Sequence, residues 1–178
     1  MRKREIVLPE TRPETEWVRG RALQKVSPNF WHGDLQAGIA GALRAWARRG
    51  RYGRVASEWR FRVNPPGQPI RPLIPDVAYL SFEALAADAP PACVGYPLGA
   101  PTIAVEILSP RDRSDDVAEK IGVYLAAGCA GVFVVDPLRR TLSIHDGGVR
   151  VLTEAGVLQH DALPGFALSL AELFAQRE

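Results

Sequence analysis

Hydrophobic and polar residues alternate along several short stretches of the chain, and this period of two predicts β-strands, while residues 102–108 and 131–136 are nearly continuous apolar runs that suit buried strands. The stretches that we expect to form strands are residues 54–63, 74–81, 102–108, 131–136, 141–146 and 149–154. Residues 141–146 and 149–154 are separated by Gly147 and Gly148, so we expect these two strands to pair as a hairpin.

Two other stretches carry apolar residues at a spacing of three or four, which predicts helices. The first follows Ser27 and Pro28, residue types preferred at an N-cap and at the first helical position, and it ends near Gly50. The second is capped by Ser114 or Asp112. The apolar positions are Leu35, Ile39, Leu43 and Trp46 in the first helix, and Val117, Ile121, Tyr124 and Leu125 in the second.

The order of these elements predicts the fold class. A short hairpin around Gly20 comes first, followed by a helix, three strands, a helix, a strand and further strands. The closing residues 163–174 are expected to pack back on the body. This order indicates an α/β or α+β fold with a mixed central sheet flanked by helices. The chain has no GxGxxG or Walker A motif, so a nucleotide-binding fold is unsupported.

Composition narrows the class of protein. The length of 178 residues suits one domain spanning the whole chain, with residues 1–13 as a flexible or dimer-forming segment. The net charge of +2 is too small to indicate nucleic-acid binding by itself. No apolar stretch is long enough to span a membrane, no signal peptide precedes the fold, and Cys93 and Cys129 have no metal-ligand or redox spacing. We therefore expect a reduced, cytoplasmic protein.

One carboxylate interrupts a strand that is otherwise suited to the centre of a sheet. In residues 102–108, six of seven positions suit a buried strand, and the seventh is Glu106. A buried, unpaired carboxylate costs several kcal/mol, so Glu106 needs a cation, a metal or a proton. Asp76, at the start of its own predicted strand, raises the same question.

Two acids on neighbouring strands can lie a few ångströms apart, and a divalent cation relieves their repulsion. Oxygen ligands of this type suit Mg²⁺ or Mn²⁺ better than zinc. The structural alternative is that Asp76 caps a strand end and that Glu106 pairs with an arginine or lysine. Taken together, the two acids favour a site.

Four further residues are candidates for the site, and each has a structural alternative. Lys120 lies about 85° from the centre of the apolar face of its helix, so it could reach over the strand ends or pair with Asp116 on the same helix. His32 shares the inward face of the first helix and could be a packing residue. Glu58 and Glu16 could each point into a site or into solvent.

The chain resembles the Uma-two family of restriction endonuclease-like proteins, which belongs to the PD-(D/E)XK nuclease superfamily. The resemblance rests on EWVRGRALQKVSPNFWHGDL, IPDVAYLS, PTIAVEILSPRDRSDDVAEKIGVYLAAGCAGVFVVDP and LPGFALSLAELF. These segments cover nearly the whole chain from about residue 14, and the segment 101–137 is the most specific. The resemblance implies a core with a helix, a three-stranded antiparallel unit, a second helix and a further strand joined in parallel.

The resemblance also implies roles for particular residues. Asp76 matches the superfamily aspartate, and Glu106 matches the acid of the (D/E)XK element. Leu108 stands where the usual pattern has lysine, so Lys120 would supply the positive charge from a migrated position. The family tends to carry residues of the same types at the positions of His32 and Glu16.

The expected activity is metal-dependent hydrolysis of phosphodiester bonds in DNA. Asp76 and Glu106, with a backbone carbonyl near Ile107, would hold Mg²⁺ or Mn²⁺, and Lys120 would orient water or stabilise developing negative charge. Duplex cleavage usually needs two active sites, which leads us to expect a homodimer. The residues expected to meet the DNA are Arg48, Arg49, Arg51 and Arg54 after the first helix, or Arg111 and Arg113, although each also suits ordinary surface charge.

Two other functions stay open at this point. The leucine at position 108 also suits an inactive module that binds nucleic acid or protein on the same fold. The same acids could instead serve a metal-dependent hydrolase of small phosphoesters, which an activity screen on small phosphodiesters beside plasmid DNA would identify.

Overall fold

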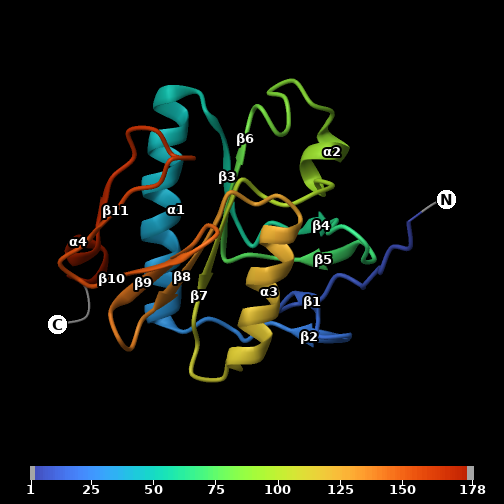
Figure 1. Cartoon of the computed structure of the whole chain (residues 1–178), viewed down its shortest axis with the longest axis horizontal. Coiled ribbons are helices and arrows are strands. Elements are labelled where there is room, and N and C mark those ends of the chain that lie inside the picture. Colours follow the sequence, from blue (N-terminus) through green and yellow to red (C-terminus); the bar gives the residue numbers. More distant parts are fainter. Residues whose placement is uncertain (1–2, 176–178) are drawn as a thin grey trace.

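The computed structural model describes residues 3–175 and is built around a mixed sheet of six strands (Figure 1). The strand order is β10-β9-β8-β7-β6-β3, in which β7 and β8 are parallel and every other neighbouring pair is antiparallel. The strands are β3 (Gly53–Ser57), β6 (Val77–Ser81), β7 (Ile103–Ile107), β8 (Gly131–Asp136), β9 (Thr141–His145) and β10 (Val149–Leu152). The predicted mixed central sheet is confirmed.

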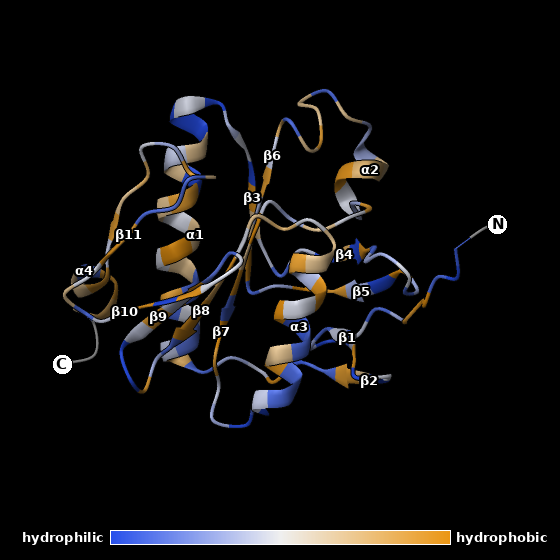
Figure 2. Ribbon diagram, viewed as in Figure 1, coloured by the Kyte–Doolittle hydropathy of each residue, from blue (hydrophilic) through white to orange (hydrophobic). Residues whose placement is uncertain are grey.

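The two long helices cover opposite faces of this sheet. Alternate residues of β7 explain why, since Ile103 and Val105 pack in the core with α1 (Phe30–Gly50), whereas Ala104 packs in the core with α3 (Ser114–Ala126). Figure 2 shows hydrophobic residues concentrated on the strands between the helices. The parallel step from β7 through α3 to β8 is a crossover, because parallel neighbours cannot be joined by a tight turn.

Smaller elements complete each layer. The hairpin of β1 (Thr15–Val18) and β2 (Arg21–Gln24) turns at Arg19 and Gly20, which both have positive φ. The remaining elements are the paired strands β4 (Phe61–Val63) and β5 (Arg71–Leu73), the paired strands β11 (Val157–Leu158) and β12 (Leu168–Ser169), and the short helices α2 (Pro91–Gly95) and α4 (Leu170–Phe174).

The ends of the chain pack against this body. The closing segment buries Phe166 and Phe174 in the core beneath α1, as expected for a tail that packs back. Near the other end, the backbone N–H of Ile6 donates to the carbonyl of Ile70 at 2.8 Å, which aligns the described part of residues 1–13 with the start of β5. Within residues 3–175, no helix is long and apolar enough to cross a membrane.

The starts of the two long helices differ from the sequence-based expectation. The first helix begins at Phe30, because Asn29 is its N-cap and accepts a hydrogen bond from the N–H of His32; Ser27 and Pro28 precede the helix. Arg113 is the N-cap of α3, and neither Ser114 nor Asp112 caps it. The side chain of Asp112 accepts from the N–H of Ser109 instead, so it stabilises the preceding loop.

The predicted strand 54–63 is two strands in two sheets. Residue Glu58 has a φ of 50°, which turns the chain out of the central sheet after β3. The chain re-enters extended structure as β4, which pairs with β5. The alternation of apolar residues continues on both sides of this turn, and for that reason the pattern alone indicated one continuous strand.

Candidate functional site

Two buried carboxylates meet at one end of the central sheet. Asp76 precedes β6 by one residue and Glu106 lies in β7. Because Val77 pairs with Val105 in an antiparallel register, Asp76 lies opposite Glu106. One oxygen of Asp76, Oδ2, also accepts a 2.6 Å hydrogen bond from the backbone N–H of Ile107. The residues Asp76 and Glu106 are 3% and 7% exposed, so both carboxylates need compensation within the protein.

Lys120 supplies that compensation for Glu106. Its Nζ lies 2.6 Å from Glu106 Oε2 and 2.9 Å from Glu16 Oε2. Tyr124, one turn further along α3, donates its hydroxyl to Glu106 Oε1 at 3.2 Å. Glu16 is itself fixed by the backbone N–H of Ile74, which donates to its Oε1 at 2.6 Å. The lysine side chain therefore joins β7 to the N-terminal hairpin.

The alternative partner of Lys120 is occupied elsewhere. Asp116 binds the guanidinium of Arg21, with Nη2 of the arginine 2.7 Å from Oδ2 of the aspartate. The helix face that holds Lys120 is turned to the strand ends, and Lys120 itself is only 7% exposed. The structure therefore places Lys120 among the buried acids and away from solvent.

A second lysine, Lys25, binds the other acid. Its Nζ lies 2.7 Å from Asp76 Oδ1, 2.9 Å from the carbonyl oxygen of Ile74 and 2.9 Å from Glu58 Oε2. Glu58 is positioned by the turn after β3, and its Oε1 accepts from Gln36 Nε2 at 2.8 Å. The amide of Gln36 also donates to the backbone carbonyl of Asp76 at 2.8 Å. Glu58 is thus linked to Asp76 through Lys25, but it does not line the cavity that holds the two acids.

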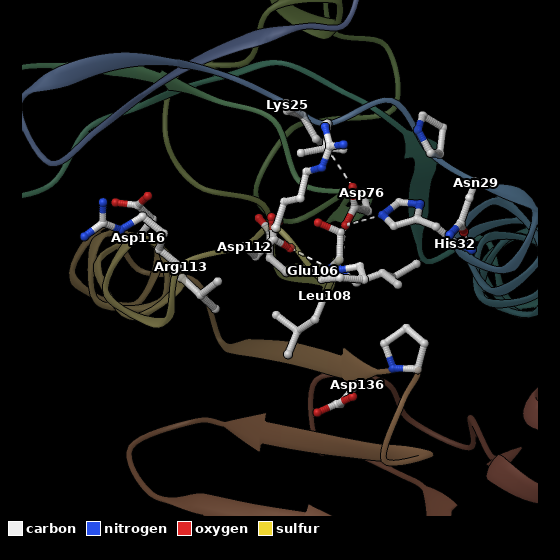
Figure 3. A pocket seen from close by; sticks show the side chains of 18 of the residues that line it. Lys25, Asn29, His32, Asp76, Glu106, Leu108, Asp112, Arg113, Asp116 and Asp136 are labelled. Carbon is white, nitrogen blue, oxygen red and sulfur yellow. Dashed lines mark hydrogen bonds and ion pairs between the residues drawn. The ribbon is translucent and has the colours of Figure 1, made fainter.

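His32 reaches the same acid from the first turn of α1. Its Nε2 lies 3.5 Å from Asp76 Oδ2, and Figure 3 shows Asp76 between Lys25 and His32. The other ring nitrogen, Nδ1, is buried and has no hydrogen-bond partner within residues 3–175. His32 lies on the helix side that also presents Leu35 and Ile39, so its inward position follows from the helical spacing.

The pKa values of these groups follow from burial and from their neighbours. Burial raises the pKa of Glu106 to about 8, because loss of hydration together with the nearby Glu16 and Asp76 carboxylates outweighs the attraction of Lys120. The pKa of Asp76 is lowered, since Lys25 and then His32 more than offset its burial. Burial alone would lower the pKa of Lys120, but the Glu106 and Glu16 carboxylates raise it, so this lysine stays charged.

These groups line a cavity of about 790 Å³ (Figure 3). Its walls come from the hairpin, the start of α1, the loop before α3 and the turn after β8. The lining residues are Glu16, Arg21, Leu23–Asn29, Trp31, His32, Asp76, Glu106–Arg113, Asp116, Val117, Lys120 and Asp136–Arg139. Glu16, His32, Asp76, Glu106 and Lys120, all singled out in the sequence, therefore share one cavity with the backbone of Ile107.

The basic residues expected to meet DNA separate into two groups. Arg111 and Arg113 line the cavity. Arg48, Arg49 and Arg51 lie at the C-terminal end of α1, about 24 Å along the helix from His32 at 1.5 Å per residue. The guanidinium of Arg54 donates to the carbonyls of residues 85–87 and therefore supports that loop.

Lys25 is the site residue that the sequence reasoning missed. The available signal was its position, since it is the only formally charged residue between Arg21 and Asp34, in the link from the hairpin to the first helix. Tyr124 was recognised only as a core residue, and its hydroxyl contact with Glu106 could not be read from helical spacing.

The described residues contain no group of three or more histidine, cysteine, aspartate or glutamate side chains arranged to hold a metal ion. Any metal bound here would therefore rely on one or two carboxylates, with remaining ligands from the backbone, water or substrate. Magnesium is commonly bound in this way.

Comparisons with known proteins identify the fold and the family of the chain. A crystal structure titled "putative nuclease belonging to DUF820" from Anabaena variabilis superposes with a TM-score of 0.83 at 22% identity, covering 94% of this chain and 93% of that one. At this identity the likeness shows a shared fold. No curated protein matches the chain. The sequence model of the Uma2 family, described as "Putative restriction endonuclease", matches residues 5–171. The chain therefore belongs to the Uma2 family of restriction endonuclease-like proteins.

Proposed function

We propose that this protein is a metal-dependent nuclease that hydrolyses phosphodiester bonds in DNA. The observation that carries the proposal is the contact of Lys120 with Glu106, at the point where Glu106 faces Asp76 across two strands. This contact supplies a cation beside the second acid even though Leu108 replaces the usual lysine. It therefore counts against an inactive module.

The two acids fit a magnesium or manganese ion. A carboxylate offers about four lone-pair sites, and Glu106 uses two of its own, for Lys120 and Tyr124. Asp76 accepts from Lys25, from the N–H of Ile107 and from His32. Asp76 and Glu106, with the Ile107 carbonyl, would hold the ion, and hydrated Mg²⁺ would take its other ligands from water and phosphate.

The bound ion would lower the pKa of a water ligand and polarise a phosphoryl oxygen. The side chains of the site would then orient the reacting groups and stabilise the charge that develops on them. Lys120 is held between Glu106 and Glu16, so its ammonium is preorganised to orient the attacking water or to stabilise negative charge that develops on the phosphate. The N–H of Ile107 fixes the rotation of the Asp76 carboxylate.

Two substitutions and one control test this proposal. Asp76→Asn and Glu106→Gln are expected to abolish Mg²⁺- or Mn²⁺-supported cleavage, assayed on both plasmid DNA and single-stranded circular DNA, and to weaken metal binding measured by calorimetry. Asp88→Asn is the control, because Asp88 is an exposed carboxylate that does not line the cavity, and it should leave both measurements unchanged. Wild-type protein that binds no divalent cation, or Asp76→Asn protein that still cleaves, would contradict the proposal.

A further inference from the structure

The cavity walls combine aromatic and basic side chains above the buried acids. We propose that the cavity accepts a single DNA strand, with a base stacked on Trp31 and the backbone phosphates bound by Arg111 and Arg113. This inference rests on the proposed nuclease function and specifies the substrate that the same site admits.

The depth of the reacting groups is the first reason. Glu106 and Lys120 are each 7% exposed and Asp76 is 3% exposed, so a phosphate must enter the cavity to contact them. The volume of about 790 Å³ lies in the range of about 300–1,000 Å³ that encloses a small organic ligand. A duplex, with two stacked strands, is too bulky to enter, whereas one flexible strand can bend into the site.

Two aromatic side chains at the start of α1 are the second reason. Trp31 lines the cavity and is 38% exposed, and Phe30 beside it is 68% exposed. Their rings are 5.0 Å apart in an edge-to-face arrangement. Partly exposed aromatic rings beside basic side chains are the usual platform for unpaired bases, because every base can stack on them regardless of sequence. Trp31 adjoins His32, which contacts Asp76, so a base stacked on Trp31 would bring its phosphate close to the acids.

The charges around the cavity are the third reason. Arg111 and Arg113 are exposed, and within residues 3–175 neither guanidinium forms a hydrogen bond or an ion pair. Their loop is nevertheless ordered by Asp112, whose Oδ2 accepts from the N–H of Ser109 at 2.7 Å. Ser109 Oγ is buried in the same loop and has no partner among the described residues. The loop therefore presents two available cations to the cavity.

The acidic residues of the lining offset these cations only in part. Asp112 stands between the two arginines, so residues 108–113 keep one net positive charge. Asp116 is bound by Arg21 at 2.7 Å, and Asp136 is bound by Arg139 at 2.8 Å. Positive charge on the loop before α3 is thus left available for a polyanion. A single active site is sufficient for one strand, so this substrate places no requirement on the oligomeric state.

The test measures binding without cleavage, in the presence of a chelator. Fluorescence anisotropy compares a short labelled single strand with the blunt duplex formed by annealing its complement. We expect the single strand to bind at least about fivefold more tightly than the duplex. A gain in affinity of this size is what one stacked base supplies. Trp31→Ala should weaken single-strand binding by a similar factor, and Trp31→Phe should retain most of the affinity.

The contribution of Arg111 and Arg113 is tested separately, through the salt dependence of binding. Replacing Arg111 or Arg113 with alanine should reduce the slope of log affinity against log salt concentration by about 0.7 for each phosphate that is no longer neutralised. Replacing both Arg48 and Arg49 with alanine should change single-strand binding little, because these residues lie at the far end of α1. Circular dichroism of each variant verifies that it is folded.

The outcomes separate this inference from the proposed function. Equal or tighter binding of the duplex, no binding of either DNA, or unchanged affinity in folded Trp31→Ala would overturn the inference. Single-strand binding that depends on Trp31, in a protein that cleaves nothing with Mg²⁺ or Mn²⁺, would support the inference and refute the nuclease activity. Metal-dependent cleavage of duplex DNA alone would support the nuclease activity and refute the inference.

Discussion

Replacement of Lys120 by methionine removes a buried ammonium and keeps an unbranched side chain of similar length. The ammonium contacts Glu106 Oε2 at 2.6 Å and Glu16 Oε2 at 2.9 Å, and all three side chains are nearly inaccessible to water. The variant therefore leaves two carboxylates in the interior without their shared cation. Removing one partner of a buried ion pair typically costs about 3–5 kcal/mol.

The size of the effect should depend on pH. The pKa of Glu106 is already raised to about 8 by burial, and loss of Lys120 raises it further. Where the pH is low enough, a proton on Glu106 replaces part of the lost charge, so we expect the destabilisation to be smaller at about pH 5, larger at about pH 8 and larger still above pH 8. For a chain of this length, 3–5 kcal/mol lowers the melting temperature by about 6–20 °C.

Urea unfolding followed by circular dichroism measures this change in the free energy of unfolding. The double variant Lys120→Met/Glu106→Gln should recover part of the loss, because it removes one of the two uncompensated charges. Arg150→Met is the matched control: Arg150 is 56% exposed, its ion pair with Asp146 lies at the surface, and its loss should cost less than about 1 kcal/mol. A Lys120→Met variant within about 1 kcal/mol of wild type at pH 8, or a double variant no more stable than the single one, would refute this geometry.

Three further predictions use the same unfolding assay or calorimetry. The pKa of Glu106 is raised from 4.5 to about 8 in the folded protein, so between these pH values the folded protein binds more protons than the unfolded chain. The free energy of unfolding should therefore fall by a few kcal/mol as pH rises from about 4.5 to about 8, and Glu106→Gln should flatten this slope. Gly53→Ala should destabilise the fold by about 1–3 kcal/mol, since the added Cβ would lie 2.3 Å from a backbone carbonyl oxygen of β6. The control is Gly41→Ala in α1, where the added Cβ would have no atom within 4 Å; this variant should be neutral or stabilising. Lys25→Met should strengthen Mg²⁺ binding in a calorimetric titration, because its ammonium competes for Asp76 Oδ1; weaker binding would show that Lys25 supports the metal site.

Much of the architecture could be predicted because it depends on local periodicity. The strand from Thr141 to His145 has a period of two and the helix from Phe30 to Gly50 has a period near 3.6, and each pattern identifies both the element and its buried face. The inward position of His32 follows from the same helical spacing. The errors lie at boundaries, where one conformation can interrupt a regular pattern, as the positive φ of Glu58 divides residues 54–63.

The acids were recognisable in the sequence because charge in an apolar strand needs an explanation, and this reasoning is local to Glu106 and to Asp76. Lys120 was also expected near Glu106, but the pairing of Lys25 with Asp76 and of Glu16 with Lys120 was not recognisable in that way. Lys25 lies 51 positions from Asp76, and Glu16 lies 104 positions from Lys120, so only the folded chain shows which cation meets which acid. An ion pair depends on distances in space, and long-range contacts leave no periodic trace in the order of residues. The amino-acid order thus specified the strands, the helices and the buried acids, whereas the pairing of those acids and the cavity above them arise from tertiary packing.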